Sequence, residues 1–503
     1  MLSVVVTACL WAMQGNLVQV EVNVARGLPA WHVVGLGDKT IRESVDRIRS
    51  ALVNAGYDYP RQDITINLAP AGTQKHGSHF DLPTAIAILT ATGFIDPPCL
   101  RQVGFLGELS LSGDLNRIDG CLLLTETLRK AGMKQVIVPR GNASEASLVQ
   151  GVEILPAASL QEVVDHLKGD APLIPFPSPS ENSQRMASHP EAVYGDYKDV
   201  RGQESGKRVM MICAAGGHGV LMQGSPGCGK TMLARRLPTI LPPMSYEESM
   251  EVTSIYSVAG LLGEDRQIIR ERPFRAPYQG ITLPAMLGGG IRPVPGEFSL
   301  AHHGVLFLDE IAQFDRSIIN AMRVPLEERR VSIARRQGSA VFPGNVIFVA
   351  ASNPCPCGWL GDSRKACVCT GHQIRSYQEK LSGPVMDRID MHIKLERVDP
   401  ENGSRALSSS EMRKQVTRAR DRQRKRYAAE RYALNSDLPA DAMEQYLSLS
   451  KEAEALMKEA YQKMPLTMRT YHRTVRVART IADLEEEDMV QAHHVAEALR
   501  YRR

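Results

Sequence analysis

The segment from Gly224 to Thr231, Gly-Ser-Pro-Gly-Cys-Gly-Lys-Thr, has the residue types and spacing of a phosphate-binding loop. Its glycines let backbone N–H groups close around phosphate oxygens, Lys230 reaches the β and γ phosphates, and Thr231 ligates Mg²⁺. A short match of this kind can arise by chance, but here a strand-like run precedes it and a helix-forming run follows. The sequence therefore predicts that ATP and Mg²⁺ are bound by Gly224, Ser225, Pro226, Gly227, Cys228, Gly229, Lys230 and Thr231.

Polar residues at the ends of two further apolar runs would complete the chemistry of hydrolysis. The run Val305–Leu308 ends in Asp309 and Glu310. Asp309 is predicted to join the metal shell, and Glu310 is predicted to orient an attacking water. A third apolar run ends in Asn353, whose amide is in a position to help place that water. Each feature alone is also typical of a solvated strand end or a turn, but together with the phosphate-binding loop they predict ATP hydrolysis.

The elements that must position these residues recur along the chain in the order strand, glycine turn, helix. From residue 193 to residue 400 this order is typical of a parallel α/β sheet. Residues 1–167 mix alternating β-branched runs with helical spacing, which predicts a separate α+β domain. The stretch 168–192, rich in Pro and Ser, is predicted to be a linker. Helical spacing and charge dominate residues 401–503, which are predicted to form a helical lid.

Length and composition limit the classes of protein to consider. The 503 residues exceed what one core usually supports, and 43% hydrophobic with 23% charged residues is ordinary for globular domains. The 60 Lys and Arg residues against 56 Asp and Glu leave a net charge of +4, so contacts with nucleic acid are expected only in local patches. No stretch predicts a membrane span, and the apolar start lacks the basic flank of a signal peptide. The nine cysteines, five of them scattered singly, suit a reducing cytoplasm.

Six segments together resemble the Mg-chelatase-like AAA+ proteins of the ComM/YifB family. They are Asp199–Gln203, Gly224–Pro238, Arg272–Pro277, Pro295–Gly304, Asn353–Gly358 and Leu381–Asp390. The resemblance implies that Asn353 is sensor 1, that Arg388 is an arginine finger for a neighbouring subunit's nucleotide, and that Arg469 is sensor 2. It also implies a P-loop AAA+ core in a homo-oligomeric ring, a hexamer. A cation that arrives when subunits pack would stabilise the transition state of γ-phosphate transfer.

One segment departs from the pattern of this family. The family commonly has a pair of histidines after Arg-Ser-Pro, whereas this chain has Ala276, Pro277, Tyr278 and Gln279. Any role inferred for these positions from the resemblance therefore stays open.

The N-terminal region resembles the Lon-protease fold, of the ribosomal S5 domain 2 type, in the segments Asn67–Gly77 and Gly107–Gly120. Aligning these segments puts His79 at the position of the nucleophilic serine and Leu122 at that of the general-base lysine. A Ser–Lys dyad needs a hydroxyl and an amine within hydrogen-bond reach, and neither residue supplies one. The resemblance thus implies a proteolytically inactive domain with a scaffold or binding role.

Four cysteines form a candidate metal site. Cys355 and Cys357 make one Cys-x-Cys pair, and Cys367 and Cys369 make another. Four thiolates at this spacing can close a tetrahedral structural Zn²⁺ site. The spacing within each pair departs from the usual two-residue gap, and free buried thiols are the alternative.

Two basic stretches are candidate DNA contacts. Residues 329–342 resemble two strands around a polar turn, and in related ATPases a hairpin placed there projects into the pore of the ring. Arg335 and Arg336 would then track a phosphate backbone. In the most basic stretch, residues 413–427, a shared helical face can neutralise phosphates without reading sequence; its residues are Arg418, Arg422 and either Lys425 or Arg426. A solvated hairpin tip and a solvated helix face are the respective alternatives.

These features predict an ATP-driven ring motor. The ComM-type resemblance implies that the motor acts on DNA, in branch migration or a helicase-type role during recombination or natural transformation. The alternative is a chelatase-like ATPase that remodels a protein partner. A third reading, a proteolytic machine, is disfavoured by His79 and Leu122.

Overall fold

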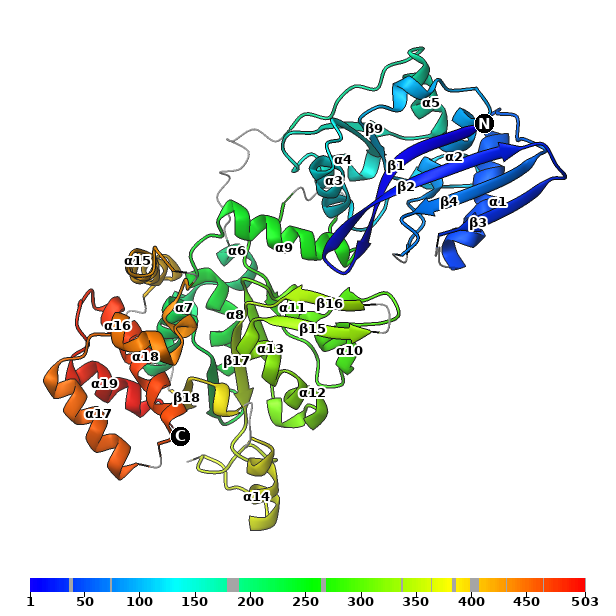
Figure 1. Ribbon diagram of the computed structural model, residues 1–503. Helices are drawn as coiled ribbons and strands as arrows, with labels where there is room; N and C mark the ends of the chain where they lie inside the picture. The colour runs from blue at the N-terminus through cyan, green and yellow to red at the C-terminus, as the bar shows by residue number, and fades with distance from the viewer. Residues whose placement is uncertain are drawn as a thin grey trace.

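The described residues form two large β-sheets, three two-stranded ribbons and a helical end, seen along the ribbon from blue to red in Figure 1. The structure is a computed structural model. It describes residues 1–35, 39–72, 75–178, 190–263, 268–335, 338–362, 364–381, 386–398, 407–430, 432–464 and 466–502. This mixed α/β architecture with a parallel sheet and a helical C-terminal region confirms the predicted fold class.

The N-terminal sheet has seven strands in the order β3-β4-β2-β1-β5-β8-β9. They are β1 (Leu2–Trp11), β2 (Gln14–Ala25), β3 (Ala30–Val34), β4 (Asp63–Ala69), β5 (Val103–Phe105), β8 (Gln135–Pro139) and β9 (Glu153–Ala157). Strand β1 is buried on both faces: Val5 and Cys9 point into one hydrophobic cluster, and Ala8 and Leu10 point into another. The first cluster includes α1 (Lys39–Asn54), α2 (Asp81–Ala91) and α5 (Leu160–Lys168), and the second includes α3 (Cys121–Lys130) and α4 (Ala143–Ala146). A small ribbon, β6 (Glu108–Leu109) with β7 (Leu115–Asn116), lies beside this sheet's helices.

The second sheet has five strands in the order β11-β14-β17-β10-β18, and every pairing is parallel. The strands are β10 (Val220–Gly224), β11 (Phe274–Arg275), β14 (Val305–Leu308), β17 (Ile347–Ser352) and β18 (Met391–Leu395). All residues of β14 and β17 are buried, which explains why these strands appear in the sequence as continuous rather than alternating apolar runs. Because parallel strands share one direction, the polar residues that follow β10, β14 and β17 meet at a single edge.

Helices and two short hairpins surround this sheet. The helices are α6 (Glu191–Tyr194), α7 (Glu204–Gly216), α8 (Lys230–Ile240), α9 (Tyr246–Val258), α10 (Leu283–Leu287), α11 (Glu297–Leu300), α12 (Arg316–Ala321), α13 (Arg323–Glu328) and α14 (Gly371–Lys380). One hairpin joins β12 (Gly288–Gly289) to β13 (Val294–Pro295), and the other joins β15 (Arg330–Arg335) to β16 (Gly338–Pro343). The second hairpin matches the pair of strands expected over residues 329–342.

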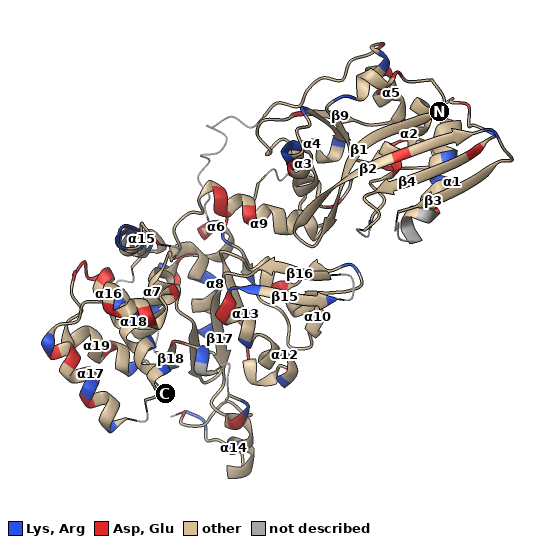
Figure 2. Cartoon of the chain, in the orientation of Figure 1, with Lys and Arg blue, Asp and Glu red and all other residues tan. Residues whose placement is uncertain are grey.

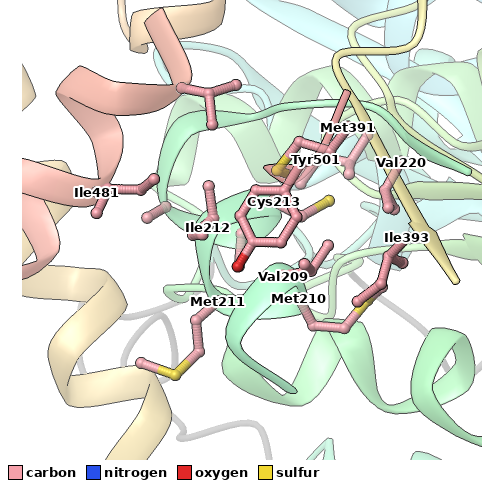
Figure 3. Close-up of a cluster of buried hydrophobic side chains, with 14 of the residues drawn as sticks. Val209, Met210, Met211, Ile212, Cys213, Val220, Met391, Ile393, Ile481 and Tyr501 are labelled. Carbon is pink, nitrogen blue, oxygen red and sulfur yellow. The ribbon is translucent and has the colours of Figure 1, made fainter. Parts of the chain in front are cut away.

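The helical end packs on the sheet rather than standing apart from it. It contains α15 (Ser409–Arg426), α16 (Met443–Tyr446), α17 (Lys451–Lys463), α18 (Met468–Leu484) and α19 (Ala492–Arg500). Figure 3 shows Val220 and Met391 of the sheet in one buried cluster with Ile481 of α18 and Tyr501. The backbone N–H of His392 also donates to the Tyr501 carbonyl at 2.8 Å. Within the described residues, no helix combines the length and the apolar character needed to cross a membrane.

Helix α9 joins the two sheets, and Figure 1 shows it between them. It packs against α3, where the Gly120 N–H donates to the Ser257 carbonyl at 3.0 Å. Its Tyr246 hydroxyl donates to the carbonyl of Leu148, just after α4, at 3.3 Å. A second contact lies at the turn between β1 and β2. There the indole N–H of Trp11 donates to the Ser339 carbonyl of the β15–β16 hairpin at 3.3 Å. The N-terminal sheet is therefore in contact with a hairpin that is predicted to face DNA.

Candidate active site

The loop between β10 and α8 has the backbone conformation that its glycines were expected to allow. Gly227 and Gly229 have φ angles of 77° and 95°, in the left-handed region that L side chains rarely adopt. At Gly224 an added Cβ would lie 2.5 Å from the Leu395 carbonyl oxygen of β18, so a larger residue does not fit. Helix α8 begins at Lys230, and its N-terminus faces the loop, a suitable arrangement for phosphate.

The side chains predicted to bind phosphate and metal come together at the carboxyl edge of the five-stranded sheet. The Lys230 ammonium donates to the Gly224 carbonyl at 2.6 Å and to Oδ1 of Asn353 at 3.1 Å. The Thr231 hydroxyl donates to Oδ2 of Asp309 at 2.8 Å. A hydroxyl and a carboxylate in direct contact form a suitable oxygen pair for Mg²⁺, which prefers such ligands.

Glu310 is held at the same edge by amide side chains. Its own backbone is left-handed, with a φ of 51°. The Asn353 amide donates to Oε1 at 3.4 Å, the Gln279 amide donates to Oε2 at 3.2 Å, and Gln313 also donates to Oε2. Sequence reasoning did not find the two glutamines. Gln279 lies in the segment that departs from the family pattern. This departure was the one signal in the sequence that could have drawn attention to Gln279.

Two further residues bind backbone carbonyls of the phosphate-binding loop, and sequence reasoning assigned a role to neither. The Gln203 amide donates to the Cys228 carbonyl at 2.8 Å and to the Glu396 carbonyl at 2.6 Å. The Arg397 guanidinium donates to the Pro226 carbonyl at 2.6 Å. The sequence offered one signal, because Gln203 closes the motif Asp199–Gln203.

Arg388 and Arg469 lie at the opposite edge of the sheet. Arg388 comes just before β18, whereas the phosphate-binding loop follows the end of β10, and these parallel strands pair Val220 with Met391 and Gly224 with Leu395. A strand of this length spans roughly 15 Å. The structure therefore does not bring Arg388 or Arg469 to the chain's own phosphate-binding loop.

One carboxylate holds both arginines. Arg388 Nη2 lies 2.7 Å from Oε2 of Glu327, and Arg469 pairs with Oε1 of the same residue. The hydrogen bond from Arg388 lowers the pKa of Glu327, so the carboxylate is ionised at neutral pH. The three residues line a cavity of about 410 Å³, whose other charged lining residues are Arg329, Arg473, Arg476, Asp390 and Asp437. Arg473 lies 3.5 Å from Asp390, and Arg329 pairs with Asp437.

The four predicted cysteines lie together beside Asn353. Sγ of Cys355 is 3.4 Å from that of Cys357 and 3.6 Å from that of Cys367, and the Cys357–Cys367 distance is 3.6 Å. The Cys357 N–H donates to Cys369 Sγ at 3.4 Å, and all four sulfurs lie within 4.8 Å of one another. A tetrahedron with Zn–S bonds of about 2.3 Å has sulfurs about 3.8 Å apart, so this donor set fits Zn²⁺. Hydrogen bonds from the backbone N–H groups of Trp359 and Val368 lower the pKa of Cys357 to about 6, which favours its thiolate.

Comparison with known proteins finds relatives of the Mg-chelatase-like type along the whole chain. The family profile described as magnesium chelatase, subunit ChlI, matches residues 196–403, and its C-terminal profile matches residues 406–502. A further ChlI profile matches residues 20–142. The chain is 38% identical over 506 residues to the uncharacterized protein YifB of Escherichia coli, covering 100% of this chain and 97% of that protein. It is also 38% identical over 507 residues to competence protein ComM of Haemophilus influenzae, with the same coverage.

The chain belongs to the ComM/YifB family of Mg-chelatase-like AAA+ proteins. Membership implies ATPase activity with ATP and Mg²⁺, and assembly into oligomers. It confirms the resemblance on which Asn353, Arg388 and Arg469 were selected, whereas the roles of these residues remain predictions.

The N-terminal part of this ComM/YifB member is related to Lon proteases. It is 26% identical over 135 residues to the archaeal Lon protease of Methanocaldococcus jannaschii, a match to 27% of this chain and 20% of that protein. His79 and Leu122 are both buried, and the His79 Nε2 lies 3.0 Å from the Ala8 carbonyl oxygen. Both side chains are thus part of the core, and the lack of proteolytic activity remains a prediction.

The predicted DNA residues of this ComM/YifB member differ in their surroundings. Arg335 is exposed at the end of β15, and Arg336 lies outside the described residues. Figure 2 shows basic residues along α15, yet Arg418 pairs with Glu486 at 3.0 Å and Arg422 pairs with Asp488. Lys425 is exposed. The expectation of an open basic face on α15 overlooked these acids, which lie more than sixty residues further along the chain.

Proposed function

We propose that this chain hydrolyses ATP in a homo-oligomeric ring, a hexamer, in which each site joins the phosphate-binding edge of one subunit to the arginine edge of the next. The observation that carries the proposal is the position of Arg388 and Arg469 at the sheet edge opposite Lys230. Cations that stabilise a phosphoryl-transfer transition state must reach the γ-phosphate. A second subunit would bring them there.

Each residue of the phosphate-binding edge has a role in this proposal. Lys230 binds the β and γ phosphates, and Thr231 with Asp309 would hold Mg²⁺, which neutralises phosphate charge when bound. Glu310 orients the attacking water and accepts its proton. Asn353 contacts both Lys230 and Glu310, so it can align the water with the γ-phosphate. Gln279 and Gln313 keep the Glu310 carboxylate turned toward the site.

We further propose that the ring acts on DNA, in branch migration or a helicase-type role in recombination or natural transformation. Two observations support this. The printed name of the Haemophilus influenzae relative is competence protein, and competence is the capacity to take up DNA. In addition, Arg335 is exposed in the β15–β16 hairpin, and the Ser339 carbonyl of the same hairpin accepts a hydrogen bond from the Trp11 indole at the turn of the N-terminal sheet. A cation and an aromatic ring are the groups that hold single-stranded nucleic acid.

The second candidate function is remodelling of a protein partner. Two observations favour it: the matching family profiles are named for a magnesium chelatase subunit, and acids neutralise Arg418 and Arg422 on α15. A protein substrate would not require an open basic surface.

The ATPase rate with and without DNA separates the two candidates. Single-stranded, duplex and four-way-junction DNA are added at low and at moderate salt. A DNA motor is stimulated, and the stimulation fades with salt because phosphate contacts release counterions. Arg335→Ala should reduce the stimulation, whereas the matched control Arg418→Ala should change it little because that guanidinium already pairs with Glu486. A flat response to every DNA at every salt would favour protein remodelling.

We also propose that Cys355, Cys357, Cys367 and Cys369 bind one structural Zn²⁺. Four converging sulfurs support this, since thiolates are the preferred ligands of structural zinc. None of the nine cysteines, all of them among the described residues, forms a disulfide, which supports a reducing compartment such as the cytoplasm. Metal analysis of the purified protein tests the proposal: one equivalent of zinc is expected, and none would contradict it.

A further inference from the structure

The segment Cys355–Cys369 packs directly on the phosphate-binding loop. Its Gly358 is left-handed, with a φ of 83°, and a Cβ added there would lie 2.7 Å from Cγ of Pro226. The Asp362 carboxylate accepts a hydrogen bond from the Ser225 hydroxyl and lies 3.9 Å from Arg397 Nε. Arg397 in turn donates to the Pro226 carbonyl at 2.6 Å. The segment therefore supports the loop at two successive residues.

The start of the same segment reaches the catalytic amide. Asn353 stands two residues before Cys355, and it accepts a hydrogen bond from Lys230 while donating one to Glu310. Cys355 is buried, so the beginning of the segment is anchored next to that amide. A change in the position of Cys355 would be transmitted to Asn353 through a single intervening proline.

No regular secondary structure holds the described part of the segment in shape, although the cations of Lys365 and Arg397 lie 4.8 and 5.0 Å from the centre of the Trp359 ring. Its described residues, 355–362 and 364–369, contain turns and bends but no helix or strand. The two Cys-x-Cys pairs bring its ends together, with Cys357 and Cys369 twelve residues apart and in contact at 3.4 Å. A metal that closes such a loop contributes its binding energy to the folding of the loop.

We propose that Zn²⁺ held by the four thiolates positions the phosphate-binding loop and Asn353, so that nucleotide affinity depends on zinc occupancy. This inference rests on the zinc and ATP sites proposed above. Zinc takes no part in the chemistry. It fixes the shape of Cys355–Cys369, and that shape places Asp362 on Ser225 and Gly358 on Pro226.

Two variants test the link, and Cys99→Ser is the control because Cys99 is half-buried in the N-terminal region, away from the four-cysteine segment. Cys367→Ser removes a metal ligand, whereas Asp362→Ala keeps all four thiols and removes the contacts with Ser225 and Arg397. Zinc content is measured by elemental analysis, affinity by titration with a fluorescent ATP analogue in excess Mg²⁺, and folding by circular dichroism.

Cys367→Ser should lose zinc and bind the analogue about tenfold more weakly, the loss expected from one or two hydrogen bonds to the loop. Asp362→Ala should retain zinc and weaken binding severalfold, and the control should change neither quantity.

Each contrary result has a distinct meaning. Unchanged nucleotide affinity in a folded, zinc-free Cys367→Ser protein overturns the inference and leaves the ATP site standing. Wild-type protein that binds the analogue but contains no zinc overturns the inference together with the zinc proposal. Wild-type protein that binds no analogue contradicts the proposed function itself. If Cys367→Ser does not fold, Asp362→Ala decides, since wild-type affinity in that variant rejects the coupling.

Discussion

The two edges of the five-stranded sheet carry opposite halves of the chemistry. At the carboxyl edge Lys230, Asp309 and Glu310 are held in contact with Thr231 and Asn353. At the other edge Arg388 and Arg469 share Glu327. In the proposed function the first edge binds the nucleotide and activates water, and the second edge supplies cations to a neighbouring subunit. A single chain would then bind ATP but would need a second chain for fast turnover.

The largest expected effect is the loss of nucleotide binding in Lys230→Ala. The substitution removes the ammonium that reaches the phosphates, and each hydrogen bond to a charged group contributes about 1.5–3 kcal/mol, so affinity should fall about 100-fold. Titration with a fluorescent ATP analogue measures it. Arg388→Ala should bind as wild type, because Arg388 lies at the opposite edge. Wild-type nucleotide affinity in Lys230→Ala would show that the phosphate site does not lie at the carboxyl edge.

Arg388→Ala should lower the hydrolysis rate of the assembled protein by about 10³-fold, within the range found for arginine fingers. Mixing it with Lys230→Ala sharpens the test. The Lys230→Ala subunit still presents Arg388 to a neighbour, and the Arg388→Ala subunit still binds nucleotide, so mixed rings should recover ATPase activity that neither variant has alone. If Arg388 acted within its own chain, the mixture would stay inactive.

Glu310→Gln should reduce turnover by about 10²-fold while nucleotide affinity is kept, because the amide retains its shape but accepts no proton. Gln279→Ala should have a smaller effect in the same direction, since it removes one of the three amides that orient Glu310. Steady-state rates and analogue binding are measured for both variants. A fall in affinity matching the fall in rate would mean that Glu310 supports binding rather than water activation.

Local patterns predicted much of the carboxyl edge. The phosphate-binding loop is contiguous, and Asp309, Glu310 and Asn353 each follow an apolar run that becomes a parallel strand. Gln279, Gln313 and Arg397 were not predicted because their roles depend on contacts between distant loops, which no spacing rule encodes. The division into 1–167, 168–192, 193–400 and 401–503 remains a prediction.

The basic helix shows a second limit of sequence reasoning. Helical spacing correctly places Arg418 and Arg422 on α15, but the turn after α18 brings Glu486 and Asp488 against them. Charge counted along one helix ignores charge supplied by its tertiary neighbours. The hairpin around Arg335 differs because no acidic segment pairs with Arg335 among the described residues.

The smallest expected effect tests Glu327, the acid that holds both arginines. Its side chain is 48% exposed, and partly exposed ion pairs contribute little, so Glu327→Gln should leave folding stability nearly unchanged. The substitution removes the charge that competes with a neighbour's γ-phosphate for Arg388 and Arg469. The protein concentration needed for half-maximal ATPase activity should therefore fall by about two- to fivefold. This concentration is obtained by measuring the specific ATPase rate against protein concentration. Glu328→Gln, at the next residue along α13, is the matched control. A rise in that concentration would show instead that Glu327 holds the arginines in the position that the neighbouring site requires. Glu327 would then preorganise Arg388 and Arg469 for the neighbouring nucleotide rather than restrain them.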